Sequence, residues 1–316
     1  MGGPERVIVT GGAGFIGSSL VRALVARGLQ VVVLDNLAST WWLRLLEDVA
    51  DRIEYVHGDV RLAEDLERIA PGRCDRVYHL AASFANELSM EYPTIDMRSN
   101  IEGTLNVLAM AKRLGCGLFV YTGSSSSYGD VPLPFEEDGP TRPYTPYATS
   151  KHLGETYVRS SGLSYAIFRL FNVYGPGDPP GRYRNAVPNM MVALDRPDGQ
   201  IRIFGRDASR DFTYVDDVVR VLLEADCAAG QVVNVGTGQE TRIVDLARQI
   251  LHLFDLPESR MRMEEPRGWD RVVRRCASVE RLQSLYGWIP STPLSEGLKR
   301  AACWMHEVGY VQRRPT

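Results

Sequence analysis

The sequence lacks the features that mark an exported, a metal-stapled or a membrane-spanning protein. Its five cysteines are odd in number and form no Cys-x-x-Cys pair, so we expect free thiols in a reducing compartment and no structural metal. No apolar run is long enough to cross a bilayer, and residues 1–6 lack the basic and apolar regions of a signal peptide. We therefore expect a cytoplasmic protein with no membrane partner. An exported protein that has lost its leader is the alternative.

The sequence also lacks an excess of charge of either sign. Its 36 lysines and arginines stand against 39 aspartates and glutamates, which gives a formal net charge of -3. Because the basic residues are scattered, no basic stripe dominates the chain, and we expect no nucleic-acid partner. Apolar residues make up 44% and charged residues 24%, a composition that excludes disorder and is typical of a globular protein.

Short apolar runs alternate with helical patterns over the first half of the chain. The run at 7–9 is followed by a glycine-rich turn and by an amphipathic segment at 15–26, which is typical of a βαβ unit. The later runs are continuously apolar, as strands covered on both faces should be. We therefore predict an α/β fold, a Rossmann-type doubly wound parallel sheet. Its further strands are expected at 30–34, 53–57, 76–80, 118–121 and 165–170.

The second half of the chain has a different texture. Residues 174–181 are rich in glycine and proline and cannot form a helix or a central strand. We therefore predict a dinucleotide-binding domain over 1–175 and a smaller mixed α/β substrate-binding domain over 176–316, with some later segments returning to the first domain. In the second half we expect a strand at 201–204 and helices at 186–194, after 216, after 243 and at 294–307.

Three glycines of the turn, Gly11, Gly14 and Gly17, lie between the first strand and the first helix. Glycine lets the backbone approach a pyrophosphate, which binds against the free N–H groups at the start of the helix. In this strand-turn-helix context the motif predicts dinucleotide binding, and a purely structural turn is the alternative. Asp35 ends the second strand, where a carboxylate binds ribose hydroxyls and repels a 2′-phosphate. This favours NAD over NADP, unless Asp35 is simply a turn residue.

Tyr147 and Lys151 are one helical turn apart and therefore share a helix face. A phenol has a pKa near 10 and is a poor base at neutral pH, but a nearby ammonium and NAD⁺ itself stabilise the phenolate. A run of hydroxyl residues, Thr122 and Ser124 to Ser127, follows the strand at 118–121, at the sheet edge where open α/β sheets bind ligands. One of these hydroxyls could hydrogen-bond the substrate oxygen that Tyr147 addresses, although a flexible polar loop is the alternative.

The chain resembles the extended short-chain dehydrogenase/reductase family. The resemblance is carried by TGGAGFIG at 10–17, Asp35-Asn36, Asp59-Val60 and the stretch His79-Leu80-Ala81-Ala82, in this order, and it runs through nearly the whole chain. It implies a catalytic triad of Ser124, Tyr147 and Lys151, with Ser125 and Ser126 as rivals for the serine. His79 itself is expected to be a buried strand residue. The implied NAD contacts are Gly11, Gly14, Phe15, Ile16, Gly17, Asp35, Asn36, Ser39, Asp59, Val60, Leu80, Ala81, Ala82, Asn100, Tyr147, Lys151 and Phe171.

The resemblance is closest to the nucleotide-sugar branch, and within it to UDP-hexose 4-epimerases. It implies a diphosphate contact for Arg210, whose planar fork suits two phosphate oxygens. Counting back from Ala277 shifts the register of a later stretch by one residue, so Arg271 competes with Arg267, and Arg271, Arg274 and Arg275 could instead form a solvated basic face. The implied substrate contacts are Ser124, Ser125, Ser126, Asn172, Asn185, Ala186, Phe204, Arg210, Arg267 and Asp270.

We therefore expect an NAD-dependent isomerase that epimerises C4 of a UDP-hexose, such as UDP-glucose or UDP-galactose, or an N-acetyl or uronic acid form, through a 4-keto intermediate. The alternatives are a 4-ketoreductase, a 4,6-dehydratase or decarboxylase of the same family, and an NAD-sensing regulatory protein. Gly123 stands where family dehydratases carry an acid, and Gly177 stands where decarboxylases carry an arginine, so both of these are disfavoured. Phe84 replaces a polar residue of many hexose epimerases. A homodimer is expected, through helices near 100–113 and 147–160.

Overall fold

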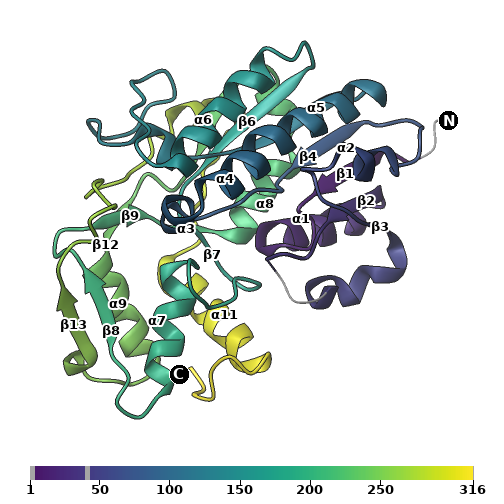
Figure 1. Ribbon diagram of the computed structural model, residues 1–316. Helices are drawn as coiled ribbons and strands as arrows, with labels where there is room; N and C mark the ends of the chain where they lie inside the picture. The colour runs from purple at the N-terminus through teal and green to yellow at the C-terminus, as the bar shows by residue number, and fades with distance from the viewer. Residues whose placement is uncertain (1–3, 40–42, 316) are drawn as a thin grey trace. The chain divides into compact units, whose positions relative to one another are not determined.

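The computed structural model describes residues 4–39 and 43–315 (Figure 1). Residues 1–3, part of the segment on which the signal-peptide expectation rests, lie outside the described residues. The chain forms two compact units whose segments alternate along the sequence. The first comprises the residues through Ser127, Pro143–Arg169 and Val219–Val233, and the second comprises Tyr128–Arg142, Leu170–Val218 and the residues from Asn234 onward. The prediction that residues 1–175 bind the dinucleotide and residues 176–316 bind the substrate stays a prediction.

A seven-stranded sheet forms the centre of the first unit, in the order β11-β6-β5-β4-β1-β2-β3. Strand β1 pairs in parallel with both β2 and β4, while β3 pairs with β2 and β5 with β4, also in parallel. This is the strand order of a doubly wound sheet, so the predicted Rossmann-type fold class is confirmed. The strands are β1 (Arg6–Thr10), β2 (Gln30–Asp35), β3 (Ile53–His57), β4 (Arg76–His79), β5 (Leu118–Ser124), β6 (Tyr165–Leu170) and β11 (Val232–Val235).

Burial on both faces explains the continuous apolar runs of the central strands. Every residue of β1 is buried, and Ile8 pairs with Val32 on one side and with Val77 on the other. Helix α1 packs on β1 and β2, whereas α5 and α6 pack on β4 and β5. The strand order reverses between β1 and β4, and open sheets of this kind bind ligands beyond the carboxyl ends of the strands at that point.

Strand β5 continues through Ser124, although the apolar pattern predicted its end at Tyr121. The difference arises because its last residues are polar or small but still buried, and the Thr122 hydroxyl donates a hydrogen bond to the carbonyl of His79 at 3.1 Å. The run of apolar residues ends before the strand does, so it cannot reveal that the strand continues through polar residues. The extension carries Ser124 to the carboxyl edge of the sheet.

The helices of the first unit include α4, α5 and α6, which lie side by side (Figure 1). Helix α6 begins at a proline, and the hydroxyl of Thr145 accepts a hydrogen bond from the Ala148 amide, so its start is capped. The bounds are α1 (Phe15–Ala26), α2 (Ala63–Glu67), α3 (Asn86–Glu91), α4 (Pro93–Met97), α5 (Gly103–Arg113) and α6 (Pro146–Arg159), with a π-helical stretch at Arg98–Glu102 and 3₁₀ turns at Leu43–Arg52, Ser125–Tyr128 and Ala225–Ala228.

The second unit combines two-stranded sheets with helices. The sheets pair β7 (Val173–Tyr174) with β10 (Thr213–Tyr214), β9 (Ser209–Asp211) with β12 (Glu240–Arg242), and β8 (Ile201–Phe204) with β13 (Met261–Glu264). Helices α7 (Ala186–Asp195), α9 (Ile243–Leu253) and α11 (Leu294–Glu307) pack together (Figure 1), and α10 spans Glu280–Tyr286. Helix α8 (Val215–Leu223) runs across the division between the units. The strand expected at 201–204 and the helices expected at 186–194 and 294–307 are confirmed.

Within residues 4–39 and 43–315, no helix is both long and apolar enough to pass through a membrane. The same residues contain no cluster of three or more histidine, cysteine or acidic side chains that could hold a metal ion.

Candidate active site

The glycine turn folds back on the start of α1. Gly11 has φ +73°, which favours glycine, and a Cβ there would lie 2.6 Å from the amide nitrogen of Ala81. A Cβ on Gly17 would lie 2.1 Å from the carbonyl oxygen of Gly11. No side chain therefore fits at either position, and the backbone lies bare at the start of the helix. The side chains of Phe15 and Ile16, in the first turn, are partly exposed beside it.

Asp35 lies at the end of β2 and ties that strand to the turn. Its carboxylate accepts hydrogen bonds from the amides of Ala13 at 3.0 Å and Leu37 at 2.8 Å. Burial raises the pKa of Asp35, and these two hydrogen bonds oppose that effect. These two hydrogen bonds are the contacts expected if Asp35 were simply a turn residue. Each carboxylate oxygen still has a second acceptor position, which a ribose hydroxyl can use.

Asn36 and Asp59 meet beyond the ends of β2 and β3. The Asn36 amide donates to Asp59 at 2.9 Å, and the Arg61 guanidinium pairs with the same carboxylate at 2.5 Å. Although burial alone would raise the pKa of Asp59, the hydrogen bonds from Arg61 and Asn36 lower it to about 2. Asp59 is therefore ionised. Val60 packs against α5, since a Cβ on Gly103 would lie 2.7 Å from it. Ser39 lies near the glycine turn, with its hydroxyl 3.9 Å from a Cβ on Gly14.

The segment after β4 faces the turn across the switch point. The Leu80 amide donates to the Thr10 carbonyl at 3.0 Å, and the side chains of Leu80, Ala81 and Ala82 are partly exposed. His79 is buried, as expected, and its two ring nitrogens lie 2.7 and 3.0 Å from the hydroxyls of Thr10 and Thr104.

Asn100 is buried in the π-helical stretch. Its amide nitrogen lies 3.0 Å from each of three acceptors: the Ser83 carbonyl, Asp96 and the Ser150 hydroxyl. Its side-chain oxygen is also buried and has no hydrogen-bond donor among the described residues. Ser150, in α6, also donates to Asp96 at 2.6 Å. This network lies directly beside Lys151 in the sequence, and Asp96 interacts with the charge of Lys151.

Tyr147 and Lys151 lie in the first turns of α6. The Tyr147 side chain is partly exposed, whereas Lys151 is 4% exposed and its ammonium lies 4.4 Å from the centre of the Tyr121 ring. Burial lowers the pKa of Lys151 to about 8, and the charges of Asp96 and Glu155 oppose this decrease. The ammonium is therefore buried one helical turn from a tyrosine that is partly exposed, and a positive charge close to a phenol lowers its pKa.

The serine loop follows β5 directly. The Ser124 hydroxyl accepts a hydrogen bond from the Ser126 amide at 3.1 Å, and its own proton can still be donated to a ligand. Ser125 and Ser126 are as buried as Ser124, so burial does not separate the three candidates. Hydrogen bonding does not separate Ser124 from Ser126 either, because the Ser126 hydroxyl also accepts a hydrogen bond, from the Asn86 amide at 3.3 Å.

Phe171, expected to contact the cofactor, lies within an aromatic cluster of the second unit. Its ring is 6.3 Å from Tyr128 and 6.2 Å from Phe135, and its side chain has no exposed surface. The structure thus favours a core role for Phe171. Its neighbour Asn172 has a buried side-chain oxygen that finds no donor among the described residues.

Asn185 stands at the N-cap position of α7, next to Ala186, but its side chain makes no capping hydrogen bond there and instead donates to Asp178 at 2.9 Å. Burial raises the pKa of Asp178 to about 7, and the hydrogen bond from Asn185 opposes this rise. Asp178 was not among the predicted site residues. A single aspartate in a glycine- and proline-rich stretch gives no signal that it is buried.

Arg210 and Asp270 meet in the second unit, 60 residues apart in sequence. The Arg210 guanidinium lies 2.8 Å from the Asp270 carboxylate and also donates to the carbonyls of Ser209 and Val273 at 2.8 Å. Arg275 lies 3.7 Å from the same carboxylate and is buried, which corrects its interpretation as part of a solvated face. Two guanidinium groups therefore share one carboxylate.

Arg267 stacks on two aromatic rings. Its guanidinium lies 4.2 Å from the ring centre of Phe204 and 5.6 Å from that of Trp269. The structure thus brings two predicted substrate residues, Arg267 and Phe204, together. The competing Arg271 is exposed.

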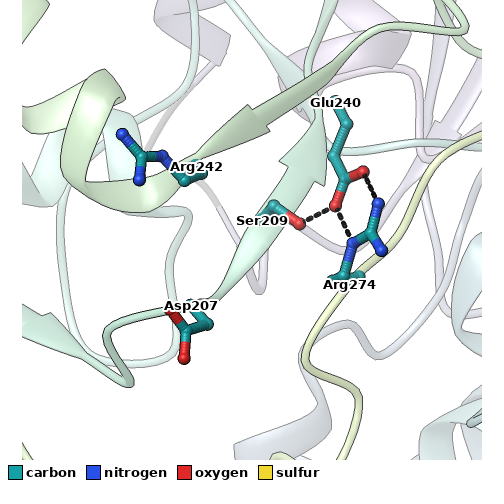
Figure 2. Close-up of a pocket in the computed structure, with 5 residues that line it drawn as sticks. All are labelled: Asp207, Ser209, Glu240, Arg242 and Arg274. Carbon is teal, nitrogen blue, oxygen red and sulfur yellow. Dashed lines mark hydrogen bonds and ion pairs between the residues drawn. The ribbon is translucent and has the colours of Figure 1, made fainter.

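A polar pocket of about 250 Å³ lies elsewhere in the second unit (Figure 2). Glu240 pairs with Arg274 at 2.5 Å and accepts a hydrogen bond from Ser209. Arg242 pairs instead with Asp245 at 2.7 Å. The pocket contains none of the predicted site residues, and one pair of its charges, Glu240 and Arg274, is formed between lining residues.

Residues 7–236 of the chain match the model of a known family, described as "NAD dependent epimerase/dehydratase family". A protein of Methanocaldococcus jannaschii named putative UDP-glucose 4-epimerase is 33% identical over 305 residues, which cover 95% of this chain and 98% of that protein.

The backbone of the chain is also similar to those of two solved structures. The UDP-glucose 4-epimerase of Thermotoga maritima, solved with UDP-glucose, has a TM-score of 0.88 and 31% identity, covering 96% of this chain and 99% of that one. The UDP-glucose 4-epimerase of Thermus thermophilus, solved with NAD, has a TM-score of 0.85 and 32% identity, covering 95% and 99%.

Proposed function

The chain belongs to the NAD-dependent epimerase/dehydratase family, and from that premise we propose that it is a UDP-hexose 4-epimerase. It is an NAD-dependent enzyme of the nucleotide-sugar epimerase and dehydratase class. The finer proposal is supported by the pair on α6, a partly exposed Tyr147 one turn from the buried ammonium of Lys151, together with the likeness over nearly the whole chain to a protein named putative UDP-glucose 4-epimerase. The proposed substrates are UDP-glucose and UDP-galactose, or the N-acetyl or uronic acid forms of these sugars.

The first unit fits the dinucleotide. Gly11 and Gly17 leave a bare backbone at the start of α1, where a side chain would collide with the chain itself, and Asp35 retains acceptor positions for ribose hydroxyls. The negative charge of Asp35 favours NAD over NADP. When bound, NAD⁺ supplies a hydride acceptor that returns the hydride after the sugar has turned over. The residues that would hold it are those predicted from the sequence, with Phe171 acting as support from the core.

The catalytic residues then have distinct tasks. Lys151 keeps a positive charge beside Tyr147, which lowers the cost of forming the phenolate. Tyr147 removes the proton from the O4 hydroxyl of the sugar and returns it at the end of the cycle. Ser124, whose oxygen is held by the Ser126 amide, donates its proton to the same substrate oxygen and so orients it.

The second unit supplies groups for the nucleotide diphosphate. Arg210 and Arg275 both lie within ion-pair distance of the Asp270 carboxylate, so this buried cluster brings together two guanidinium groups, which suit phosphate oxygens. We assign Arg267 and Phe204, which stack on each other, to the same ligand. The remaining residues proposed to bind substrate are Ser125, Ser126, Asn172, Asn185 and Ala186.

One contact disfavours the dehydratase alternative. A Cβ on Gly123 would lie 2.8 Å from a carboxylate oxygen of Glu155, which forms a buried ion pair with Arg169 at 2.8 Å. An acidic side chain at position 123 would therefore need the ion pair to move.

We also propose that two copies pair through the first unit. The side chains of Ile95, Leu105, Leu153 and Tyr157 are exposed on α4, α5 and α6, which lie side by side (Figure 1). Exposed apolar side chains on adjacent helices favour a protein interface. Sedimentation of the wild type and of Leu153→Glu tests this, because the charged side chain should shift a dimer toward monomer. A wild type that sediments as a monomer refutes the proposal.

The function is tested by incubating the purified protein with UDP-glucose, UDP-galactose, their N-acetylated forms and UDP-glucuronate, without added cofactor. We expect interconversion at C4, and we expect Tyr147→Phe to abolish it while NAD stays bound. Release of carbon dioxide or a 4-keto-6-deoxy product would contradict the proposal. Activity that depends on added NADH or NADPH would favour a ketoreductase instead.

A further inference from the structure

The side chain of Asn86 connects two segments that carry proposed catalytic groups. Its amide nitrogen donates to the Ser126 hydroxyl at 3.3 Å, and its amide oxygen accepts from the Thr145 hydroxyl at 2.6 Å. Both partners are buried. Asn86 stands at the first residue of α3 and belongs neither to the glycine turn nor to the triad.

The Thr145 contact reaches the helix of the triad. The Thr145 oxygen accepts from the Ala148 amide at 3.2 Å, and this contact caps α6. A hydroxyl has a single proton, so the proton of Thr145 goes to Asn86. The amide of Asn86 is thereby oriented, with its oxygen toward Thr145 and its nitrogen toward the serine loop. Tyr147 lies two residues beyond the cap.

The Ser126 contact reaches the serine of the triad. Ser126 receives the Asn86 amide at its side chain and donates its own backbone amide to the Ser124 hydroxyl at 3.1 Å. The hydrogen bonds therefore run from the cap of α6 through Asn86 and Ser126 to Ser124. Two groups that must address one substrate oxygen are joined by one short chain of contacts.

The backbone conformation just before Asn86 is unfavourable. Ala85 has φ +78° and ψ 125°, a region that residues with a Cβ rarely adopt. Such conformations persist where surrounding contacts determine them, and they concentrate at functional sites. Here the buried Ser89 hydroxyl donates to the Asn86 carbonyl at 2.7 Å and holds the chain just after the strained residue.

We propose that Asn86 is a positioning residue, which sets the Ser124 hydroxyl relative to the Tyr147 phenol. This inference rests on the proposed function, because it assigns both groups to one substrate oxygen. Neither Ser126 nor Thr145 alone connects the loop and the helix. Displacement of a reacting group by about 1 Å can cost about 100-fold in rate, so a missing connection has a measurable effect.

The test is Asn86→Val, which has a similar volume and no hydrogen bond. We expect kcat for C4 interconversion to fall about 10- to 100-fold, with KM for the UDP-sugar and the content of bound NAD nearly unchanged. Asn86→Asp keeps an acceptor for Thr145 and should recover part of the loss. Ser161→Ala removes a hydrogen bond of 3.1 Å just beyond the far end of α6 and should leave kcat unchanged.

A double-mutant cycle identifies the path. If Asn86 acts through the serine loop, Asn86→Val should cost much less kcat in a Ser126→Ala background than in the wild type. The inference is overturned by an active wild type and an equally active Asn86→Val. It is also overturned if KM rises while bound NAD and the unfolding temperature fall together with kcat, in both Asn86 variants, because that marks a structural role. A wild type without C4 activity refutes the proposed function and the inference with it.

Discussion

Two clusters of buried charge, one around Lys151 in the first unit and one around Asp270 in the second, are held in different ways. In the first unit, Asp96 is bound by neutral donors, Ser150 and Asn100, and Lys151 is held against the Tyr121 ring. In the second unit, Arg210 and Arg275 are bound directly to a carboxylate, that of Asp270. Asp96 and Lys151 therefore interact through their charges, with Asp96 hydrogen-bonded to neutral groups. Arg210 and Arg275, by contrast, form ion pairs with Asp270.

The difference matches the two proposed tasks. Lys151 must be charged while Tyr147 exchanges a proton, and burial lowers the pKa of Lys151 to about 8, so its charge depends on the pH and on the nearby charge of Asp96. A group that binds a diphosphate must stay charged throughout the cycle. Arginine cannot be deprotonated in proteins, and a shared carboxylate holds its planar group in place. The comparison can be tested by removing one charge from each arrangement.

The largest effect is expected from Asp270→Asn, because it leaves two buried guanidinium groups without their counter-ion. We expect the free energy of unfolding to fall by about 2–3 kcal/mol, less than for a fully buried pair since Asp270 is partly exposed. Urea denaturation measures it. Saturating UDP should restore stability in the variant more than in the wild type, because the diphosphate replaces the lost charge.

The matched control is Asp245→Asn, which removes the carboxylate from a surface pair with Arg242. Its effect should stay below about 1 kcal/mol. Equal losses in the two variants would contradict the distinction between a buried shared carboxylate and a surface pair.

The same contrast explains which parts of the molecule the sequence predicts well. The turn at Gly11 to Gly17 and the pair Tyr147 and Lys151 are short patterns, and the geometry between their members follows from one turn or one helix. The strands of the first unit are equally local, since burial on both faces makes each an apolar run. These features could therefore be predicted without the structure.

The second unit depends on contacts between distant residues, which spacing does not reveal. Arg274 and Arg275 are neighbours in an extended segment, yet Arg274 is exposed and Arg275 is buried against Asp270. Successive side chains of extended chain point in opposite directions, so one residue of register decides between the two. Asn86 was missed for a similar reason, because its two partners lie 40 and 59 residues away.

A smaller effect is expected from Asp96→Asn, which removes a charge from the first arrangement. Burial lowers the pKa of Lys151 to about 8, and Asp96 raises it, so the variant should have a lower pKa still. Catalysis requires the ammonium, which is lost as the pH rises through this pKa. The alkaline limb of the kcat profile should therefore move to lower pH, by about one unit, with a loss of up to about tenfold at pH 8.

One other charged group, Glu155, and one neutral histidine, His79, also interact with Lys151. Glu155 also raises the pKa of Lys151, while burial lowers the pKa of His79 to about 3, so that histidine is neutral throughout. Ser150→Ala removes a hydrogen bond from Asp96 but leaves its charge. Its alkaline limb should stay near that of the wild type, and parallel limbs for Asp96→Asn and the wild type would refute the role of the charge.

The smallest effect is expected from Arg274→Gln, which probes the pocket of Figure 2 beside the buried cluster. Arg274 pairs with Glu240 at 2.5 Å, but its side chain is 61% exposed, and a pair of this kind contributes little to stability. We expect the free energy of unfolding to change by less than about 1 kcal/mol and KM for the UDP-sugar to stay the same. Arg275→Gln, one residue further, should raise that KM, because it removes a guanidinium from the proposed diphosphate site. A rise in KM for Arg274→Gln instead would place the diphosphate on the other face of this segment and reverse our assignment.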